Sequence, residues 1–238
     1  MGQQESGHPV IKNEREVPAI RRVDDLIIRI FAVVIFTVYA GYCFEISFVR
    51  LHSVDFANLQ LLQVGRVLAI FTVGLYTTII AFLYIVRLRP VSKSSGVIPS
   101  ITALVGGFMM MSLLLFNSRE DLPVGMQVFA DVLVVIGNIF AAIVFVQLGR
   151  SFSILPEGRR LVTHGVYSVV RHPLYLAETV SVTGLAITYW SPWVVVLAVV
   201  WFATQLARTY NEEKVLKEYF PEYLDYARKT SRVIPGLY

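Results

Sequence analysis

The sequence has little charge and almost no cysteine for its length. Of its 238 residues, 16% are charged and 55% are hydrophobic, whereas soluble domains usually carry about 25% charged residues. This composition argues against a soluble globular protein and predicts a polytopic membrane protein. The single cysteine, Cys43, lies within an apolar run, so an intrachain disulfide framework and a cysteine-based metal site are both excluded.

Several familiar signatures are also missing. The chain has no internal repeat, no low-complexity tract and no G-x-G-x-x-G segment after a strand, so any nucleotide-like cofactor must be held in another way. No basic stripe with interleaved aromatic residues is present, and nucleic acid is therefore not an expected partner. The net charge of +4 is better explained by membrane topology and anionic lipid headgroups.

The apolar runs predict an all-α protein with about six membrane spans, because a bilayer core needs about 20 consecutive apolar residues per helix. The last run, 174–207, is too long for one span and is broken at Ser191-Pro192, since proline lacks an N–H group and fixes φ. Its two arms of roughly 16 residues, about 25 Å each, predict a tight helical hairpin. The four earlier runs are 26–48, 62–86, 97–116 and 124–148.

The runs divide the chain into three regions. Residues 1–25 are polar and predict a cytosolic N-terminal tail, residues 26–148 form four transmembrane helices, and residues 149–238 hold nearly all the unusual chemistry. In this topology all but three of the 21 Lys and Arg residues fall on one side of the membrane. The positive-inside rule makes that side cytosolic, with both termini on it.

Polar residues within the first four spans are expected to be structural. Ionisable groups inside a membrane are costly and often functional, but Glu45, Asp131, Asn138 and Gln147 do not form the ladder of sites that a pump requires. Exposure at the membrane interface or pairing with a neighbour explains them. The Gly106-Gly107 pair predicts a close approach between two helices.

A polar segment precedes the hairpin, and it ends in Arg171-His172-Pro173. Pro173 suits the first position of a helix, because its missing N–H costs nothing there. His172 is then the cap residue, Tyr175 lies one turn into the helix, and the free N–H groups favour an anion. These features predict a site for a carboxylate and a sugar or base. The alternative is an aromatic belt at the membrane interface.

The C-terminal segment supplies a second group of polar residues. Arg208 is expected to end the sixth helix, with Glu212 four residues later on the same face. The pair is either a surface ion pair or a functional pair in which Arg208 binds a carboxylate and Glu212 binds ribose hydroxyls. The mixed pattern of 211–230 predicts an interfacial helix, interrupted at Phe220-Pro221, that covers a pocket formed with the preceding loop.

Three motifs occur in order: LVTHGVYSVVRHPLY (161–175), RTYNEE (208–213) after the hairpin, and FPEYLDYARKTSRVIPG (220–236). Together they resemble the isoprenylcysteine carboxyl methyltransferase family over 149–236. The resemblance implies an integral membrane methyltransferase that uses S-adenosyl-L-methionine, with Arg208 contacting the carboxylate of the lipid substrate. The implied cofactor-binding residues are Leu161, Val162, Tyr167, His172, Pro173, Leu174, Tyr175 and Glu212.

The sequence departs from the family pattern at two places. Ala177 replaces the glycine of an H-P-x-Y-x-G element, and Arg159-Arg160 stand where eukaryotic members have His-Asn. The loop SFSILPEGRR (151–160) resembles the prokaryotic branch, which implies a prokaryotic inner membrane rather than the endoplasmic reticulum.

The expected reaction is methyl transfer to a membrane-embedded acceptor, above all the carboxylate of an isoprenylated cysteine or a similar lipid-like substrate. A carboxylate is ionised at pH 7 and needs no general base, whereas an amine or thiol must lose a proton. The alternatives are a phospholipid amine, another lipid, a small thiol, or a non-catalytic membrane scaffold of the same fold. Transport is disfavoured, because the polar groups gather at one surface. The acceptor and the oligomeric state stay open.

Overall fold

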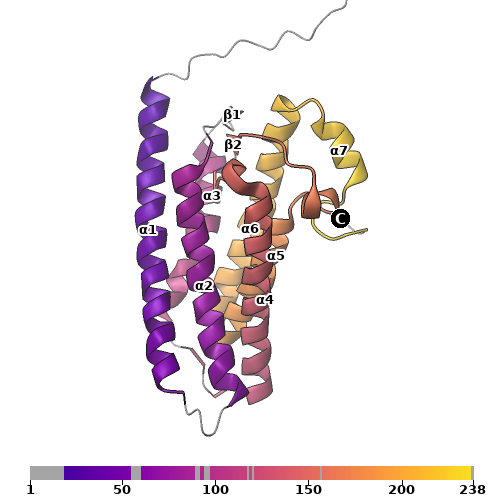
Figure 1. Cartoon of the computed structure of the whole chain (residues 1–238). Helices are drawn as coiled ribbons and strands as arrows, with labels where there is room; N and C mark the ends of the chain where they lie inside the picture. Colours follow the sequence, from indigo (N-terminus) through magenta and orange to yellow (C-terminus); the bar gives the residue numbers. More distant parts are fainter. Residues whose placement is uncertain are drawn as a thin grey trace, which may run out of the picture.

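The computed structural model describes residues 19–54, 60–88, 92–93, 97–116, 118–119, 121–155 and 157–236. It is a bundle of long helices with a short helix, α7, at one end (Figure 1). The elements are α1 (Ala19–His52), α2 (Leu61–Val86), β1 (Ser92–Lys93), α3 (Val97–Phe108), η1 (Met109–Leu115), α4 (Val124–Leu148), η2 (Gly149–Ser151), β2 (Glu157–Gly158), η3 (Gly165–Ser168), α5 (Pro173–Thr188), α6 (Pro192–Tyr219) and α7 (Tyr223–Lys229).

The predicted all-α class is confirmed, since the only strands in the described part of the chain are the two-residue pair β1 and β2. All six predicted runs are helical, and four of the helices are long and apolar enough to cross a membrane: α1, α2, α4 and α6. The α3 region is shorter, and α5 has 16 residues. Of the predicted N-terminal tail, residues 1–18 lie outside the described residues, and α1 already begins at Ala19.

The hairpin turn lies where the sequence predicts it. Ser191 caps α6 by accepting a hydrogen bond from the Val194 N–H at 3.2 Å, and Pro192 opens the helix. The prediction that Arg208 ends this helix is wrong, because α6 has 28 residues and continues to Tyr219. Charged helix-forming residues extend it until Phe220, which takes an extended conformation before Pro221.

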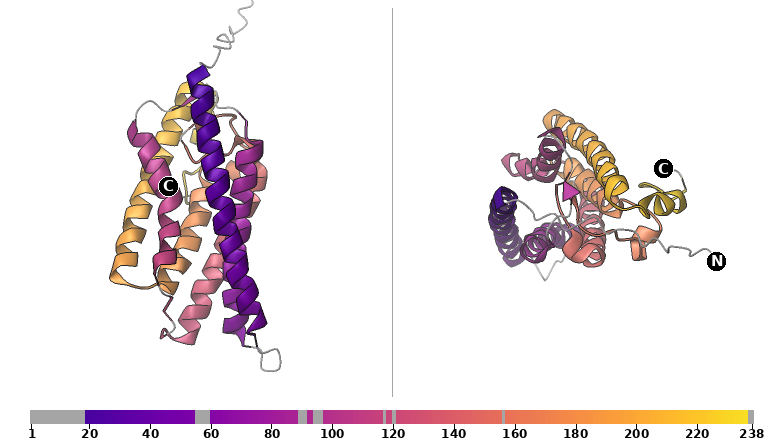
Figure 2. Two further views of the ribbon diagram at one scale, coloured as in Figure 1. Left: turned by 90° about the vertical axis from the view of Figure 1, so that its left-hand side faces the viewer. Right: turned by 90° about the horizontal axis from the view of Figure 1, so that it is seen from above.

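The segment predicted as one interfacial helix (211–230) is therefore divided between two elements. The break at Phe220-Pro221 is confirmed, but the part before it belongs to α6 and only Tyr223–Lys229 forms the separate helix α7. This short helix lies on the opposite side of the bundle from α1, at the end that holds β1 and β2 (Figures 1 and 2).

Glycine residues bring the backbones of α4 and α5 almost into contact. A Cβ atom on Gly137 would lie 2.5 Å from the Ser181 nitrogen, and one on Gly184 would lie 2.5 Å from the Ala130 carbonyl oxygen. The predicted close approach at Gly106-Gly107 is confirmed as well. A Cβ atom on Gly106 would lie 3.0 Å from the Arg208 Cδ atom, so this glycine admits α3 to the side of α6 that carries Arg208.

Three of the four polar residues singled out in the first four spans have structural partners. Asp131 forms a buried ion pair with Arg66 at 3.4 Å, as the pairing explanation predicts. Asn138 accepts a hydrogen bond from the Ser181 hydroxyl at 3.1 Å and so links α4 to α5. Gln147 accepts one from the Val166 N–H at 2.8 Å, whereas Glu45 is exposed.

Arginine residues gather at one end of the bundle, where α2 ends. We call this the arginine-rich end. Here Asp25 pairs with Arg87 at 2.6 Å, and three further guanidinium groups donate to backbone carbonyl groups in the last turn of α2 or just after it. The donors and acceptors are Arg29 to Ile85, Arg150 to Val86 and Arg159 to Leu88. The departure from the family pattern at Arg159 thus has a structural explanation.

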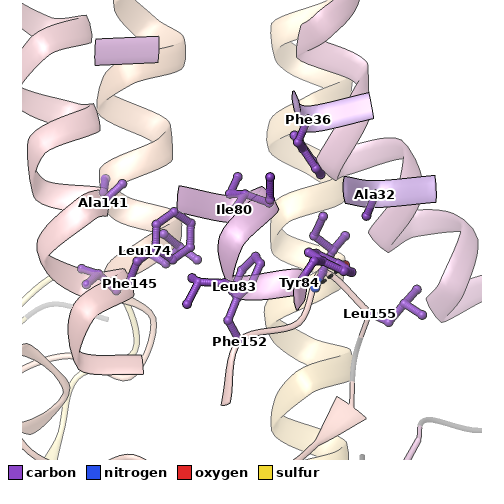
Figure 3. Close-up of a cluster of buried hydrophobic side chains, with 14 of the residues drawn as sticks. Ala32, Phe36, Ile80, Leu83, Tyr84, Ala141, Phe145, Phe152, Leu155 and Leu174 are labelled. Atoms are coloured by element: carbon purple, nitrogen blue, oxygen red, sulfur yellow. Dashed lines mark hydrogen bonds between the residues drawn. The ribbon is translucent and has the colours of Figure 1, made fainter. Parts of the chain in front are cut away.

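The loop between α4 and α5 is anchored to the hydrophobic core. Phe152, from the start of this loop, packs edge-on against Phe145 of α4 and Tyr84 of α2. Figure 3 shows these residues with Leu83 and with Leu174, from the first turn of α5. The core therefore contacts both the start of this loop and the first turn of α5.

Candidate functional site

The start of α5 is held by the C-terminal segment. Pro173 is the first residue of α5 and His172 precedes it, as predicted. The backbone N–H groups of Arg171 and His172 donate to the carbonyl groups of Ser231 and Arg232 at 2.9 and 3.0 Å. The chain after α7 thus returns to pair with the residues that lead into α5.

Glu213 of α6 is a buried carboxylate with several basic partners. Its Oε1 atom lies 3.1 Å from the Arg171 Nε atom, and 3.2 Å from both His172 Nε2 and Arg232 Nε. Lys217 lies 3.7 Å from the other oxygen. Glu213 therefore joins α6, the start of α5 and the C-terminal segment. Sequence reasoning missed this role, since Glu213 enters the sequence analysis only as the last residue of the RTYNEE motif.

Glu212 meets two of the predicted cofactor-binding residues. The Tyr175 hydroxyl donates to its Oε2 atom at 3.1 Å, and His172 Nδ1 lies 3.8 Å from the same oxygen. The Glu212 side chain is 40% exposed, so it can accept further hydrogen bonds. The structure thus brings His172, Tyr175 and Glu212 together, although their roles remain predictions.

Arg208 lies one turn deeper in the bundle than Glu212. Its guanidinium carbon is 5.0 Å from the centre of the Tyr175 ring, a cation–π contact. Only 7% of Arg208 is exposed, and its Nε atom has no hydrogen-bond partner in the described part of the chain. The alternative of a surface ion pair between Arg208 and Glu212 is wrong. Arg208 is buried, and these two described residues form no ion pair.

Below Arg208 the polar contacts continue along the seam between α5 and α6. Arg208 donates from Nη1 to the Gln205 Oε1 atom at 2.6 Å, and Gln205 donates from Nε2 to Glu178 at 2.6 Å. Tyr76 of α2 donates to the second Glu178 oxygen at 2.7 Å. Glu212 follows Gln205 by seven positions, which corresponds to a depth of about 10 Å along α6.

The remaining predicted residues are mostly apolar or buried. Val162, Tyr167 and Leu174 belong to the hydrophobic core, Pro173 is fully buried, and Leu161 is half-buried. They supply none of the hydrogen bonds of the polar seam described above.

Contacts from α7 and α4 hold the Tyr167 turn. Tyr226 donates to the Tyr167 carbonyl oxygen at 2.6 Å, and burial raises the pKa of Tyr226 to about 12, which keeps this donor protonated. On the other side, Gly165 takes a positive φ of 63° beside Gln147. The turn that presents Tyr167 is therefore fixed from two helices.

Comparisons with known proteins agree with the sequence motifs. Residues 126–223 match the family model described as phospholipid methyltransferase. The chain is 32% identical over 114 residues to protein-S-isoprenylcysteine O-methyltransferase A of Arabidopsis thaliana. The aligned segment covers 45% of this chain and 58% of the relative. These matches confirm the resemblance to the isoprenylcysteine carboxyl methyltransferase family, and the family-model match lies in the second half of the chain.

Two bacterial relatives bear names from metal resistance. The chain is 35% identical over 135 residues to the cobalt-zinc-cadmium resistance protein CzcN of Cupriavidus metallidurans, covering 55% of this chain and 60% of the relative. It is 40% identical over 82 residues to the nickel-cobalt-cadmium resistance protein NccN of Alcaligenes xylosoxydans xylosoxydans, covering 34% and 38%. Together with the Arabidopsis protein, these make three relatives, and the matches span 38% to 60% of their lengths.

A solved structure of a eukaryotic intramembrane Ras methyltransferase, isoprenylcysteine carboxyl methyltransferase, is also similar. It aligns with 93% of this chain and 88% of its own, at 20% identity and a TM-score of 0.42.

Proposed function

We propose that the protein transfers a methyl group from S-adenosyl-L-methionine to an acceptor embedded in the membrane, in the first place the carboxylate of an isoprenylated cysteine. The observation that carries this proposal is the seam between α5 and α6. Its partly exposed Glu212 lies beside Tyr175 and His172 at the arginine-rich end, and the buried Arg208 lies one turn deeper.

The residues at the top of the seam suit the proposed cofactor. Glu212 has a partly exposed carboxylate, the type of acceptor that ribose hydroxyls require. The His172 side chain does not cap the first turn of α5, so the N–H groups there suit the cofactor carboxylate. The aromatic rings of Tyr175 and His172, whose centres are 5.5 Å apart, suit a purine. When bound, the cofactor supplies an electrophilic methyl group.

Arg208 is placed to orient an acceptor below the cofactor. A guanidinium group binds a carboxylate in a bidentate manner, and a carboxylate is already ionised at pH 7. The chain then has to align the acceptor and exclude water, and it needs no general base. This matches the site, because His172 already lies between Glu212 and Glu213 and is not free to act as one.

The arginine-rich end faces the cytosol in this proposal, by the positive-inside rule, with both termini on that side of a prokaryotic inner membrane. A cytosolic cofactor then reaches Glu212 directly. The acceptor's apolar tail stays among the membrane-spanning helices, and its head group meets Arg208 about one turn below the cofactor.

A phospholipid amine is the second candidate acceptor, favoured by the match of residues 126–223 to the phospholipid methyltransferase model. Transfer of a labelled methyl group by the purified chain separates the candidates. The acceptors to compare are a farnesylcysteine with a free carboxylate, phosphatidylethanolamine vesicles and a small thiol.

Labelling of the farnesylcysteine, lost in Arg208→Gln and kept in the exposed variant Arg228→Gln of α7, is the expected result. Labelling of phosphatidylethanolamine alone would replace the first proposal by the second. If no acceptor is labelled while the cofactor product binds, a non-catalytic scaffold becomes the better explanation.

A further inference from the structure

A half-buried acid lies near Arg208 without pairing with it. Glu178 of α5 is one turn deeper than Tyr175, on the same face of the helix, and both of its oxygen atoms accept a hydrogen bond. Neither Glu178 nor Glu212 forms an ion pair with Arg208, although all three belong to the described part of the chain. This arrangement is unusual, because a buried guanidinium group is normally paired with a carboxylate.

Gln205 separates the two charges. Its amide oxygen accepts from Arg208 and its amide nitrogen donates to Glu178, each at 2.6 Å. Only this orientation of the amide is possible, since a guanidinium group only donates and an ionised carboxylate only accepts. Tyr76 donates to the other Glu178 oxygen at 2.7 Å and so fixes the carboxylate from a third helix.

The spacer leaves the positive charge of Arg208 without a direct counter-ion. The Arg208 Nε atom has no hydrogen-bond partner in the described part of the chain, and the guanidinium group otherwise contacts the face of the Tyr175 ring. A buried charge without a counter-ion is costly. An anionic group that binds beside Arg208 removes that cost. A cationic group would instead meet like charge.

We propose that Gln205 is a specificity-determining residue, which keeps Glu178 from neutralising Arg208 and thereby reserves the site for an acceptor with an anionic head group. Glu178 and Tyr76 act as positioning residues that fix the Gln205 amide. The proposal rests on the proposed function and deepens it. It selects the carboxylate over the amine among the candidate acceptors.

Exchanging the amide and the carboxylate tests the proposal. The double variant Glu178→Gln/Gln205→Glu keeps the size, the total charge and all three hydrogen bonds, but it places the carboxylate directly against Arg208. We expect the KM for the farnesylcysteine acceptor to rise about tenfold to a hundredfold, the loss of one charge-assisted hydrogen bond. The kcat and the affinity for S-adenosylhomocysteine should change much less.

The single variant Glu178→Gln is expected to act in the opposite direction. It removes the nearby negative charge and keeps one amide oxygen that can accept from Gln205, while its NH2 group can donate to the Tyr76 hydroxyl oxygen. Arg208 therefore attracts an anionic acceptor more strongly, and the KM falls. A merely structural role for these residues would instead impair both variants. Glu218→Gln, on the exposed surface of α6, is the matched control.

An unchanged KM in the folded double variant, or a raised KM in Glu178→Gln, would overturn the proposal. If the double variant does not fold, the KM of the single variant Glu178→Gln still tests the proposal. A wild-type protein that binds S-adenosylhomocysteine but methylates no carboxylate acceptor would overturn the proposed acceptor itself. If the wild type methylates the farnesylcysteine and the variants keep the wild-type KM, only the proposed role of Gln205 is overturned.

Discussion

Replacing Glu213 by glutamine should destabilise the arginine-rich end of the protein, where the candidate site lies. Its carboxylate lies within 3.7 Å of basic groups on Arg171, His172, Arg232 and Lys217, and its side chain is 8% exposed. Glutamine keeps the shape and one oxygen acceptor but removes the negative charge. It also introduces N–H donors that face these basic groups.

The expected loss of stability follows from these contacts. Removing one partner of a buried ion pair costs about 3–5 kcal/mol. Arg171 keeps two other acceptors, the carbonyl groups of Ala227 and Thr230, so the lower end of that range applies. A loss of about 3 kcal/mol corresponds to a fall of roughly 6–12 °C in Tm for a protein of this size.

Thermal unfolding of the detergent-purified protein measures this effect, with Glu218→Gln as the control for the loss of an exposed carboxylate on the same helix. S-adenosylhomocysteine binding should weaken in parallel, because Glu213 holds His172 and neighbours Glu212 in the chain. A Tm within about 1 °C of the wild-type value, which is well under 1 kcal/mol, would refute the role of Glu213 as the central ion-pair partner.

Three further substitutions probe the contacts that position the site. Gly137→Ala in α4 should lower Tm through a loss of about 1–3 kcal/mol in the free energy of unfolding, because its new methyl group would lie 2.5 Å from the Ser181 nitrogen. An unchanged Tm would mean that α4 and α5 are not this close. Asp131→Ala should destabilise the protein by about 3 kcal/mol in the same assay, since it leaves Arg66 without its counter-ion, and Arg66→Met/Asp131→Leu should recover most of that loss. Tyr226→Phe removes the hydrogen bond to the Tyr167 carbonyl group, so it should cost about 1 kcal/mol and weaken S-adenosylhomocysteine binding. Full affinity would show that α7 does not support the turn that carries Tyr167 for cofactor binding.

The membrane helices could be predicted from the sequence because their causes are local. Apolar runs of spanning length define the helices, and Ser191-Pro192 supplies both a side-chain cap and a first-turn proline, so the turn is fixed without any tertiary contact. The ordered motifs predict that His172, Tyr175 and Glu212 lie together. Spacing alone does not show that two segments 37 residues apart are in contact.

The length of α6 was mispredicted for a physical reason. The change to polar residues after Ala207 predicts the end of the membrane helix. An α-helix, however, leaves the apolar region without unwinding when helix-forming residues continue. The actual end is the local signal at Phe220-Pro221. The loss of apolar character marks where a helix leaves the membrane, whereas proline marks where it ends.

The deeper half of the seam was beyond sequence reasoning. Tyr76 and Glu178 are 102 residues apart, and their contact depends on how α2 packs against α5. A weak signal did exist. Tyr175 and Glu178 share one helix face, as do Gln205 and Arg208, so two polar faces were available to form a seam.

The most direct test of the account is a calorimetric titration of the detergent-purified protein with S-adenosylhomocysteine, for the wild type, Tyr175→Phe, Glu212→Gln and the control Glu218→Gln. The account predicts saturable binding by the wild type and the control. Removing the Tyr175 hydroxyl or the Glu212 charge should weaken it about tenfold or more, the effect of one charge-assisted hydrogen bond. Well-folded wild-type protein that shows no binding, or equal binding by all four proteins, would contradict the claim that this seam holds the methyl donor.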